Sequence, residues 1–339
     1  MLNTPPYGPR NDAAFLAEMN RVTRHHRLGC PEFARIWPGD NDAARVEDLP
    51  FLHVGLFKQL DLRTRAEGIR HTRVLTSSAT STGTSSRVAL DEESNRLQSE
   101  SARALLSAAL PVRDCPLLIL DHSRSLLQRG QLGARTAAAL SLRPLATELH
   151  FLLESPDDPA SVKWAAVEAA AAAANGRLLV YGFTWILWRA WESIPPSAAR
   201  ALANCTIGFV HSGGWKKLEA IRVDRATFDA RLLAHAAPGS GVTDFYGLVE
   251  QPGMIYPMDA DGLRPVPAWA DVIVRDPVTL EPLADRPGQL QLLNPLSLGS
   301  PCHSVLTEDL GRLVPGPGVK RFELIGRIPK AEVRGCANV

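Results

Sequence analysis

The apolar positions of this chain repeat at helical spacing near the start and form strand-length runs further along. Phe15, Met19 and Val22 predict a helical region over residues 11–37, interrupted at Pro31. Three later apolar runs have the length of buried strands: residues 116–121, 177–182 and 206–210. Because helical stretches alternate with these runs, the pattern predicts an α/β fold built in layers.

One of the predicted helices has recognisable ends. It runs from about residue 160 to residue 174, with Asp158 as the N-cap and Pro159 in the first turn. Asn175-Gly176 supplies its C-terminal stop. The alanine run inside it is a strong helix former, and we assign it no chemistry.

From residue 268 onward the pattern changes to short strands separated by Pro and Gly turns. The predicted strands there are residues 271–275, 288–293, 304–306 and 321–325. We therefore expect two units, a layered α/β core over residues 1–265 and a β-rich subdomain over residues 266–339.

Composition is that of an ordinary globular chain, with 339 residues, 45% hydrophobic and 22% charged. The 37 Lys and Arg against 36 Asp and Glu leave no net field for nucleic acid or an anionic membrane, so we expect neither partner. No apolar run is long enough to span a bilayer, and the first residues do not resemble a secretory signal. The five Cys are odd in number and lack metal-type spacing, which indicates reduced thiols in a cytoplasmic protein.

A hydroxyl-rich loop, residues 76–86, lies between predicted strands at residues 73–75 and 87–91. Backbone N–H groups and side-chain hydroxyls in such a loop can surround phosphate oxygens. It is not a Walker A loop, because no Gly-Lys-Ser/Thr follows. A polar hairpin without a ligand is the alternative.

Tyr246, Gly247 and Glu250 form a Tyr-Gly-x-x-Glu string after a turn at residues 238–241. The Tyr ring offers a flat face for stacking on a base, and Gly lets the backbone approach a ligand. The Glu carboxylate could hold Mg²⁺ against phosphate oxygens. A Tyr-Gly turn with a solvated Glu is the alternative.

Two stretches near strand ends are candidates for a pocket. The predicted strand 206–210 leads into His211, Gly213-Gly214 and Trp215, and open α/β sheets bind ligands at such a position. Three aromatic residues follow the strand at 177–182: Phe183, Trp185 and Trp188. They could line a pocket for an apolar or aromatic acid, and a buried helix start explains them equally well.

Charged residues at two further places complete the candidates. An Asp such as Asp309 at a strand end can accept hydrogen bonds from ribose hydroxyls, and Arg327 could donate to ribose or phosphate. Either could equally be a turn residue. The apolar segment over residues 50–58 ends in Lys58, and we interpret it as an N-terminal packing segment.

Taken in order, these motifs resemble the acyl/aryl-adenylating ligase superfamily. More narrowly, the chain resembles the acyl-protein synthetases of bacterial bioluminescence, which hand fatty acyl groups to a reductase. Five motifs follow the superfamily order: Thr80-Ser-Thr-Gly83, Gly213-Gly214, Tyr246-Gly-x-x-Glu250, Thr307-Glu-Asp309 and Gly326-Arg327. Four stretches carry the narrower match: Phe57-Lys58, residues 211–216, residues 306–311 and residues 326–336.

The resemblance implies the large N-terminal domain of an adenylate-forming enzyme and a role for each motif. The ATP phosphates would be held by loop residues: Ser78, Thr80, Ser81, Thr82, Gly83 and Thr84. Gly213 and Gly214 would border the adenine and the acid carboxylate, with His211 and Trp215 beside them.

The remaining motifs would complete the nucleotide site. Tyr246 would stack on adenine next to Gly247, and Glu250 would bind Mg²⁺. Asp309 would hold the ribose hydroxyls, and Arg327 would assist at ribose or phosphate.

The sequence departs from the superfamily in its loop and at its end. Thr80 stands where Gly is usual, and Ser85-Ser86 stand where Pro-Lys is common. After Gly326-Arg327 the superfamily continues into a mobile domain of roughly a hundred residues that brings a catalytic lysine. This chain ends at Val339, so we expect a fold without that lid, with Lys330 as the candidate replacement.

Cys336 is the candidate acyl acceptor. In the acyl-protein synthetases a Cys near the C-terminus accepts the acyl group as a thioester, and Cys336 matches that position. A flexible tail would let its thiol reach the adenylate, and Arg334 would lower the pKa of that thiol. An exposed Cys without a role is the alternative.

The resemblance thus implies a ligase that uses ATP and Mg²⁺ to activate a small fatty or aromatic carboxylic acid. Positioning and charge neutralisation would carry the reaction more than a general base. A partner reductase or another acceptor would receive the acyl group. Two rivals remain: an aryl-acid adenylating enzyme of secondary metabolism, and a catalytically weak nucleotide-binding subunit.

Overall fold

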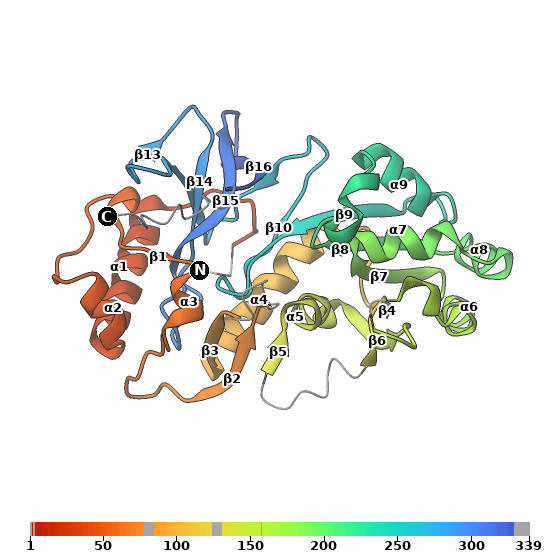
Figure 1. Cartoon of the computed structure of the whole chain (residues 1–339), viewed down its shortest axis with the longest axis horizontal. Helices are drawn as coiled ribbons and strands as arrows, with labels where there is room; N and C mark the ends of the chain where they lie inside the picture. Colours follow the sequence, from red (N-terminus) through yellow and green to blue (C-terminus); the bar gives the residue numbers. More distant parts are fainter. Residues whose placement is uncertain (1, 3, 78–84, 124–130, 157, 329–339) are drawn as a thin grey trace, which may run out of the picture.

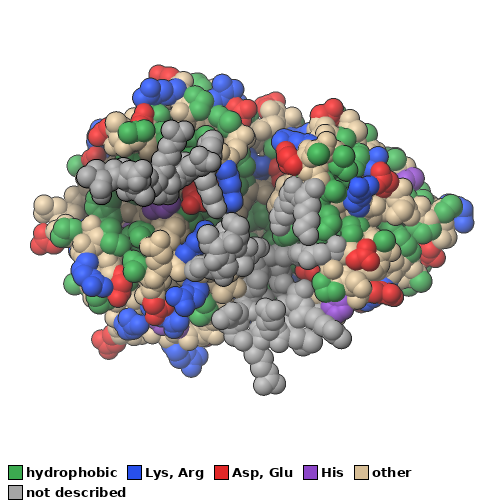
Figure 2. Space-filling model, in the orientation of Figure 1, with side chains coloured by type: hydrophobic (Ala, Val, Ile, Leu, Met, Phe, Trp, Pro, Cys, Tyr) green, Lys and Arg blue, Asp and Glu red, His purple; other side chains and the backbone are tan. Residues whose placement is uncertain are grey.

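The computed structural model describes residue 2 and residues 4–77, 85–123, 131–156 and 158–328. Figure 1 shows two halves side by side along the long axis, with the β-rich half on the left and an α/β half on the right. On the face shown in the space-filling view, basic and acidic side chains of the described residues are interspersed (Figure 2). None of the helices in these ranges is both long enough and apolar enough to cross a membrane.

The α/β half is built on a six-stranded sheet in the order β10-β9-β8-β7-β4-β6. Its strands are β4 (Cys115–Ile119), β6 (Ala146–Phe151), β7 (Arg177–Phe183), β8 (Thr206–Ser212), β9 (Gly241–Tyr246) and β10 (Tyr256–Pro257). Only β10 pairs antiparallel, and the other pairs are parallel. The central strands are buried along almost their whole length, as expected for a sheet covered on both faces.

Helices cover both faces of this sheet because successive side chains of a strand point to opposite sides. Leu178 and Val180 of β7 pack in the cluster on one face, whereas Leu179 and Tyr181 pack on the other. The first face is covered by α6 (Trp164–Ala173), α7 (Thr184–Glu192), α8 (Pro196–Leu202) and α9 (Arg225–Leu233). The second is covered by α4 (Glu92–Ala109) and α5 (Ala134–Ser141).

The β-rich half holds a seven-stranded sheet with the main order β11-β16-β15-β14-β12-β13. Its strands are β11 (Arg264–Pro265), β12 (Asp271–Arg275), β13 (Pro282–Leu283), β14 (Gly288–Leu293), β15 (Ser304–Val314) and β16 (Arg321–Arg327), joined by β1 (Leu52–His53). β1 pairs parallel with β15, and Phe15 and Met19 of α1 (Asp12–Gly29) pack on this sheet. The N-terminal segment therefore packs with the C-terminal sheet, and the boundary at residue 265 stays a prediction.

A small third sheet lies between these parts, in the order β3 (Arg87–Asp91), β2 (His71–Thr76) and β5 (Gln131–Gly133). The remaining helices are short: α2 (Pro31–Ile36), α3 (Leu56–Gln59), and the 3₁₀ turns η1 (Val46–Asp48), η3 (Arg143–Leu145), η4 (Pro159–Ser161) and η5 (Lys216–Ile221). The predicted break at Pro31 is confirmed, because α1 ends at Gly29 and α2 begins at Pro31.

Two sequence predictions need correction. The side chain of Asp158 accepts a hydrogen bond from the Ala160 N–H, but it begins only the turn η4. Val162 then pairs with Leu153 in an antiparallel bridge, so the helix starts at Trp164. The predicted end is confirmed, because Asn175 and Gly176 have φ of 46° and 73°.

The second correction concerns the Thr-Glu-Asp motif. We placed Asp309 at the end of a strand, whereas β15 continues through the motif from Ser304 to Val314. The motif is flanked by β14 and β16, and hydrogen bonding to both neighbours keeps the strand extended.

The thiols in the described ranges are all reduced and buried: Cys30, Cys115, Cys205 and Cys302. Burial raises the pKa of the Cys115 thiol to about 11, so it stays protonated near neutral pH. These four Cys are therefore packing residues. Cys336 lies outside the described residues.

A pair of buried histidines joins α1 to the segment before β15. The rings of His26 and His303 stack with centroids 4.8 Å apart. His26 Nδ1 lies 2.6 Å from Thr64 Oγ1, and His303 Nε2 lies 3.0 Å from Thr23 Oγ1. Burial lowers the pKa of His303 to about 3 and the pKa of His26 well below its ordinary value. Both imidazoles are neutral in the folded chain.

This pair predicts a loss of stability in mild acid. In the unfolded chain both histidines titrate near a pKa of about 6.5. Below that pH the unfolded state binds more protons than the folded state, so the free energy of unfolding should fall by up to about 1.4 kcal/mol per pH unit for each His. Denaturant unfolding at pH 7, 6 and 5 measures this slope. A folded H26Q/H303Q double variant should lose most of this pH dependence. An unchanged slope would contradict the role of the two histidines.

Candidate functional site

The centre of the site is a carboxylate that receives hydrogen bonds from two other strands. Asp309 lies in the middle of β15, and Arg327 lies opposite it at the end of β16. The Tyr246 hydroxyl, at the end of β9, donates to Asp309 Oδ2 at 2.8 Å. Arg327 Nε donates to Asp309 Oδ1 at 3.1 Å. Three sequence-predicted residues from two different sheets therefore meet at one carboxylate.

The Tyr246 ring is packed into the core beside this contact. Its centroid lies 6.2 Å from that of Tyr256 and 6.2 Å from that of Phe322. Burial and the nearby Asp309 carboxylate raise the pKa of the Tyr246 phenol well above its ordinary value. The hydroxyl therefore stays protonated and remains a donor to Asp309, while stacking on adenine stays a prediction.

Glu250 is a second buried carboxyl group on the loop between β9 and β10, with only 4% of the residue exposed. Burial raises the pKa of Glu250, whereas the Ser86 side chain and the Lys58 ammonium lower it. Gly247 makes the close turn before it possible, because a Cβ there would lie 3.1 Å from the Met254 carbonyl oxygen. The carboxyl group therefore lies near Ser86, at the base of the hydroxyl-rich loop.

A Mg²⁺ ion fits this arrangement only with help from a substrate. Within the described ranges no three His, Cys, Asp or Glu side chains converge to hold a metal. Mg²⁺ commonly binds through one or two carboxylates plus phosphate oxygens and waters, and a single carboxylate such as Glu250 meets that requirement.

The base of the hydroxyl-rich loop is a closed pair of hydrogen bonds. The Ser77 N–H donates to the Ser86 carbonyl at 3.2 Å, and the Ser86 N–H donates to Ser77 Oγ at 2.8 Å. The tip of the loop lies outside the described residues: Ser78, Thr80, Ser81, Thr82, Gly83 and Thr84. Lys330 and Cys336 also lie outside them.

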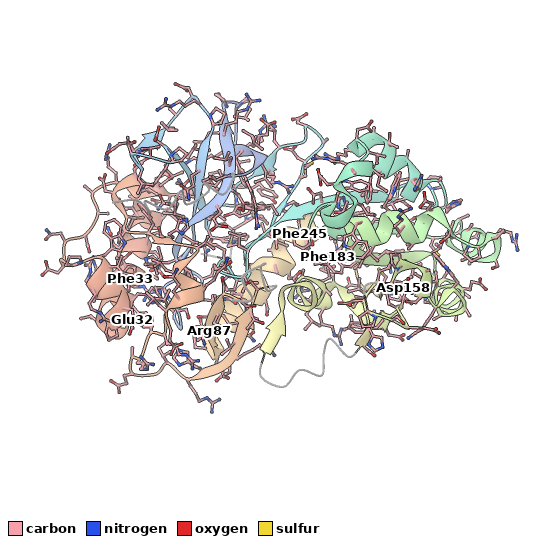
Figure 3. All side chains as sticks on the ribbon, viewed as in Figure 1. Glu32, Phe33, Arg87, Asp158, Phe183 and Phe245 are labelled. Atoms are coloured by element: carbon pink, nitrogen blue, oxygen red, sulfur yellow. The ribbon has the colours of Figure 1, made fainter. Side chains whose placement is uncertain are left out.

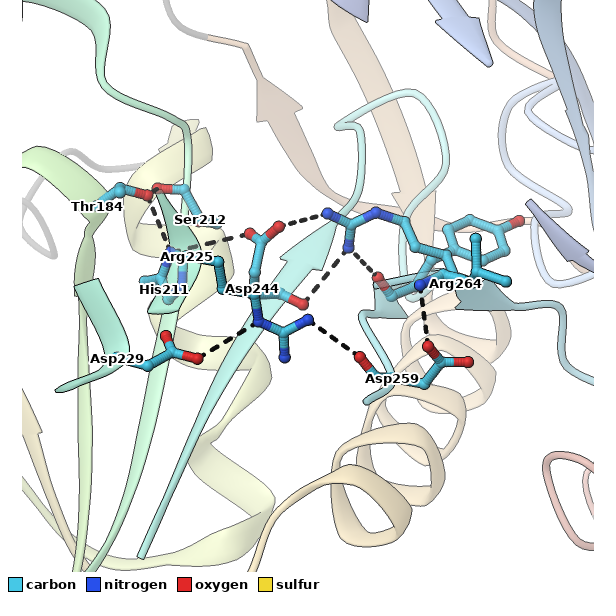
Figure 4. Close-up of polar contacts among 10 residues, drawn as sticks. Thr184, His211, Ser212, Arg225, Asp229, Asp244, Asp259 and Arg264 are labelled. Carbon is cyan, nitrogen blue, oxygen red and sulfur yellow. Dashed lines mark hydrogen bonds and ion pairs between the residues drawn. The ribbon is translucent and has the colours of Figure 1, made fainter. Parts of the chain in front are cut away.

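A polar network ties together the ends of β8, β9 and β11 (Figure 4). His211 Nδ1 lies 3.0 Å from Thr184 Oγ1 and 3.9 Å from Asp244 Oδ1. Asp244 forms an ion pair with Arg264, whose Nη1 donates to the Tyr256 carbonyl at 2.7 Å. Burial lowers the pKa of His211 to about 4, so the imidazole is neutral at pH 7. Sequence reasoning missed Asp244 and Arg264, although Asp244 lies only two residues before Tyr246.

The Gly-Gly pair directly follows this network. Gly213 and Gly214 have φ of +81° and +64°, in the region that disfavours L side chains. A Cβ on Gly213 would also lie 3.2 Å from the Phe183 ring. The pair is exposed, and its backbone is available to a ligand.

The aromatic residues predicted to line an acid pocket belong to the apolar cluster on one face of the six-stranded sheet. The Trp188 ring stacks on the Phe228 ring with centroids 6.1 Å apart. The Trp215 ring packs edge-on against Trp188, with centroids 5.5 Å apart. The Arg231 guanidinium lies 3.3 Å above the Trp188 ring. Trp185 is half-buried beside this cluster. Their role toward an acid stays a prediction.

An apolar cavity opens on the other face of the same sheet. It has a volume of about 210 Å³ and lies between α4, α5 and the loop after β9. Its walls include Gln98, Ala102, Ala138, Phe245, Leu248 and Met254. Figure 3 labels Phe245 and Phe183, which pack on opposite faces of the sheet. Sequence reasoning missed this cavity because four segments that are far apart in the sequence build it together.

A second cavity, of about 360 Å³, lies at the opposite end of the sheet strands. Asp114, Cys115 and Arg177 contribute to its walls. None of the sequence-predicted site residues lines it, so it is separate from the site around Asp309.

Comparison with known proteins agrees with this geometry. The family model described as "Acyl-protein synthetase, LuxE" matches residues 19–339. None of the curated proteins matches the sequence. The chain is similar to an open conformation of 2-hydroxyisobutyryl-CoA ligase in complex with 2-HIB-AMP and CoA, with a TM-score of 0.67 and 14% identity, over 93% of this chain and 74% of that one.

Two further structures extend the comparison. The same ligase in its thioesterification state gives a TM-score of 0.69 at 13% identity, over 96% of this chain and 70% of that one. An ATP-bound chimera of RpMatB and BxBclM gives a TM-score of 0.51 at 17% identity, over 78% of this chain and 49% of that one. At these identities the likeness concerns the fold, and it confirms the predicted layered α/β fold of the large domain. Because the family model covers nearly the whole sequence, the chain belongs to the acyl-protein synthetase (LuxE) family.

Proposed function

We propose that this chain activates a carboxylic acid with ATP, forming an acyl-adenylate and pyrophosphate, and then transfers the acyl group to a cysteine thiol. The observation that carries this proposal is the meeting of Tyr246 and Arg327 at the Asp309 carboxylate, beside buried Glu250. Membership in the acyl-protein synthetase family favours it over an aryl-acid adenylating enzyme and over a weak nucleotide-binding subunit.

Asp309 is suited to hold the ribose of ATP. An ionised carboxylate has about four lone-pair sites, and Tyr246 and Arg327 each use one. Both oxygens therefore keep capacity for the ribose hydroxyls. The Arg327 side chain is 70% exposed, so its guanidinium can turn toward a ribose or phosphate oxygen.

Glu250 would hold Mg²⁺ against the phosphates. The ion would neutralise charge on the triphosphate, and Glu250 would be ionised when the ion is bound. Among the related structures, the RpMatB–BxBclM chimera contains ATP, and 2-hydroxyisobutyryl-CoA ligase contains 2-HIB-AMP and CoA. These ligands belong to those proteins, and they support ATP as the nucleotide used here.

The first step needs position and charge rather than a base. A carboxylate oxygen of the acid attacks the α-phosphorus, and the bond from that phosphorus to the bridging oxygen of pyrophosphate breaks. Pyrophosphate leaves with the electron pair, and the acyl-adenylate remains. In the second step the Cys336 thiolate attacks the acyl carbon, AMP leaves, and a thioester forms.

The apolar cavity is the proposed site for the tail of the acid. It lies beside residues 247–249 and 251–255, so a tail inside it would leave its carboxylate near the Tyr-Gly-x-x-Glu loop. The walls favour an apolar acid, which fits a fatty or aromatic substrate. A reductase that accepts a thioester is the proposed partner.

The activity is tested by acid-dependent exchange of labelled pyrophosphate into ATP. Exchange should occur with a panel of straight-chain acids, and KM should fall about fourfold for each added methylene until the cavity is filled, since each buried CH₂ contributes about 0.8 kcal/mol. An aromatic panel run beside it separates the two substrate classes. Absence of exchange with every acid would refute the proposal.

Replacement of Asp309 should weaken ATP binding selectively. Asp309→Ala removes the ribose acceptors, and the loss should amount to about 1–3 kcal/mol of binding free energy. Asp309→Asn keeps the side-chain volume if the Ala variant is unstable, and Asp285→Ala, an exposed carboxylate in the same half, is the control. Calorimetric titration with ATP gives the affinities. An unchanged value in a folded variant would remove Asp309 from the site.

Cys336→Ser should separate activation from transfer. Adenylation uses phosphate and carboxylate contacts only, so pyrophosphate exchange should be unaffected. The wild-type chain incubated with ATP and labelled acid should retain label that neutral hydroxylamine releases, because a thioester is more labile than an oxygen ester. Hydroxylamine-labile label on the Ser variant would show that another thiol is the acceptor.

A further inference from the structure

The N-terminal segment that ends in Lys58 lies along the strand that carries Asp309. His53 of β1 pairs with Leu306 of β15, and the Val54 N–H donates to the Leu306 carbonyl at 2.8 Å. This pairing is three residues before Asp309. The segment therefore has a fixed register relative to the site.

Apolar packing fixes the position of the short helix that carries Lys58. Phe57 is fully buried in one cluster with Val88 of β3, and Val249 packs against the same cluster. Helix α3 also contacts β3. Phe57 precedes Lys58 and Val249 precedes Glu250, while Val88 lies two residues after Ser86. The segment is a packing segment, as the sequence indicated, and its packing puts Phe57 in one cluster with sequence neighbours of Glu250 and Ser86.

The Lys58 ammonium has no ion-pair partner within the described part of the chain, although the residue is half-buried. Its positive charge acts on two groups nearby in the fold, because it lowers the pKa of the Glu250 carboxyl and of the His53 imidazole. A partly desolvated cation is stabilised by an anion at hydrogen-bonding distance. The hydroxyl-rich loop, residues 76–86, contains no Lys or Arg of its own.

We propose that Lys58 is a phosphate-binding residue of the ATP site and contacts the β- and γ-phosphates of the nucleotide. The proposal rests on the proposed function, because it assumes that ATP binds beside Glu250. Lys58 would supply a mobile positive charge to the phosphates there. In the reaction Lys58 would stabilise the charge that accumulates on the leaving pyrophosphate, with no covalent step of its own.

Lys58→Met should weaken binding of ATP far more than binding of AMP. A charge-assisted contact to the β- and γ-phosphates should change the ATP dissociation constant by about tenfold to a hundredfold, whereas AMP lacks these phosphates and should change less than about twofold. Lys58→Arg keeps the charge and should restore much of the ATP preference. Lys163→Met is the matched control, because Lys163 is also half-buried but donates to the Phe151 carbonyl in the other sheet. Equal ATP-to-AMP ratios in the wild type and the folded Met variant would overturn the proposal.

A second measurement uses the wild-type chain and does not depend on a variant that folds. Limited acetylation of lysines is followed by peptide mass spectrometry with MgATP, with AMP or without nucleotide. MgATP should slow acetylation of Lys58 at least severalfold, while AMP should not, and Lys163 should react alike in all three samples. Equal reactivity of Lys58 with and without MgATP, at ATP concentrations that saturate binding, would overturn the proposal.

These measurements separate the two hypotheses. If the wild type binds ATP and exchanges pyrophosphate while Lys58→Met retains its preference for ATP over AMP, only the role of Lys58 is wrong. If the wild type neither binds ATP nor exchanges pyrophosphate with any acid, the proposed function is wrong and the assignment of Lys58 falls with it.

Discussion

The structure depends on the hydrogen bonds that join its two large sheets at Asp309. A buried carboxylate is costly unless donors satisfy its oxygens. Here the donors come from the end of β9 in one sheet and from β16 in the other. A second polar contact also joins the two sheets: Asp244 of β9, in the six-stranded sheet, forms an ion pair with Arg264 of β11, in the seven-stranded sheet. Polar contacts therefore join the two sheets at the candidate nucleotide site, in addition to the apolar core that the sheets share, and a change in their packing would also change the site.

The N-terminal segment has two roles that share one physical cause. β1 adds to the edge of β15, and Phe57 is buried against β3. The chain begins in the β-rich half, crosses into the α/β half and returns, so its N-terminal segment packs on strands that come late in the sequence. The same packing puts the charge of Lys58 where it lowers the pKa of Glu250. Phe57 and Lys58 are consecutive in a short helix, so their side chains point in different directions: Phe57 is buried in the core, whereas Lys58 is only half-buried.

Glu250 illustrates how burial prepares a charge for a ligand. Desolvation raises the pKa of its carboxyl, and the positive charge of Lys58 opposes this effect. A cation that arrives with a nucleotide would favour the ionised form further. Binding of metal and nucleotide would therefore be coupled to loss of any proton held by Glu250. His211, by contrast, is kept neutral by burial, so the network around Asp244 keeps one charge arrangement over the neutral pH range.

Local patterns in the sequence were sufficient to predict the helix at residues 12–29, the strands β7 and β8, and the helix end at Asn175-Gly176. The order of the motifs was sufficient to identify the family, because motif order is a property of the chain itself. Tertiary structure decided which side chains meet: Tyr246 and Asp309 are 63 positions apart, and their contact depends on how two sheets pack. It also decided that β15 continues through Asp309, that a bridge at Val162 delays the helix to Trp164, and that the apolar cavity lies on the α4 and α5 face. Local conformation depends on neighbours in sequence, whereas cavities and buried polar contacts depend on register and packing that the whole chain must establish together.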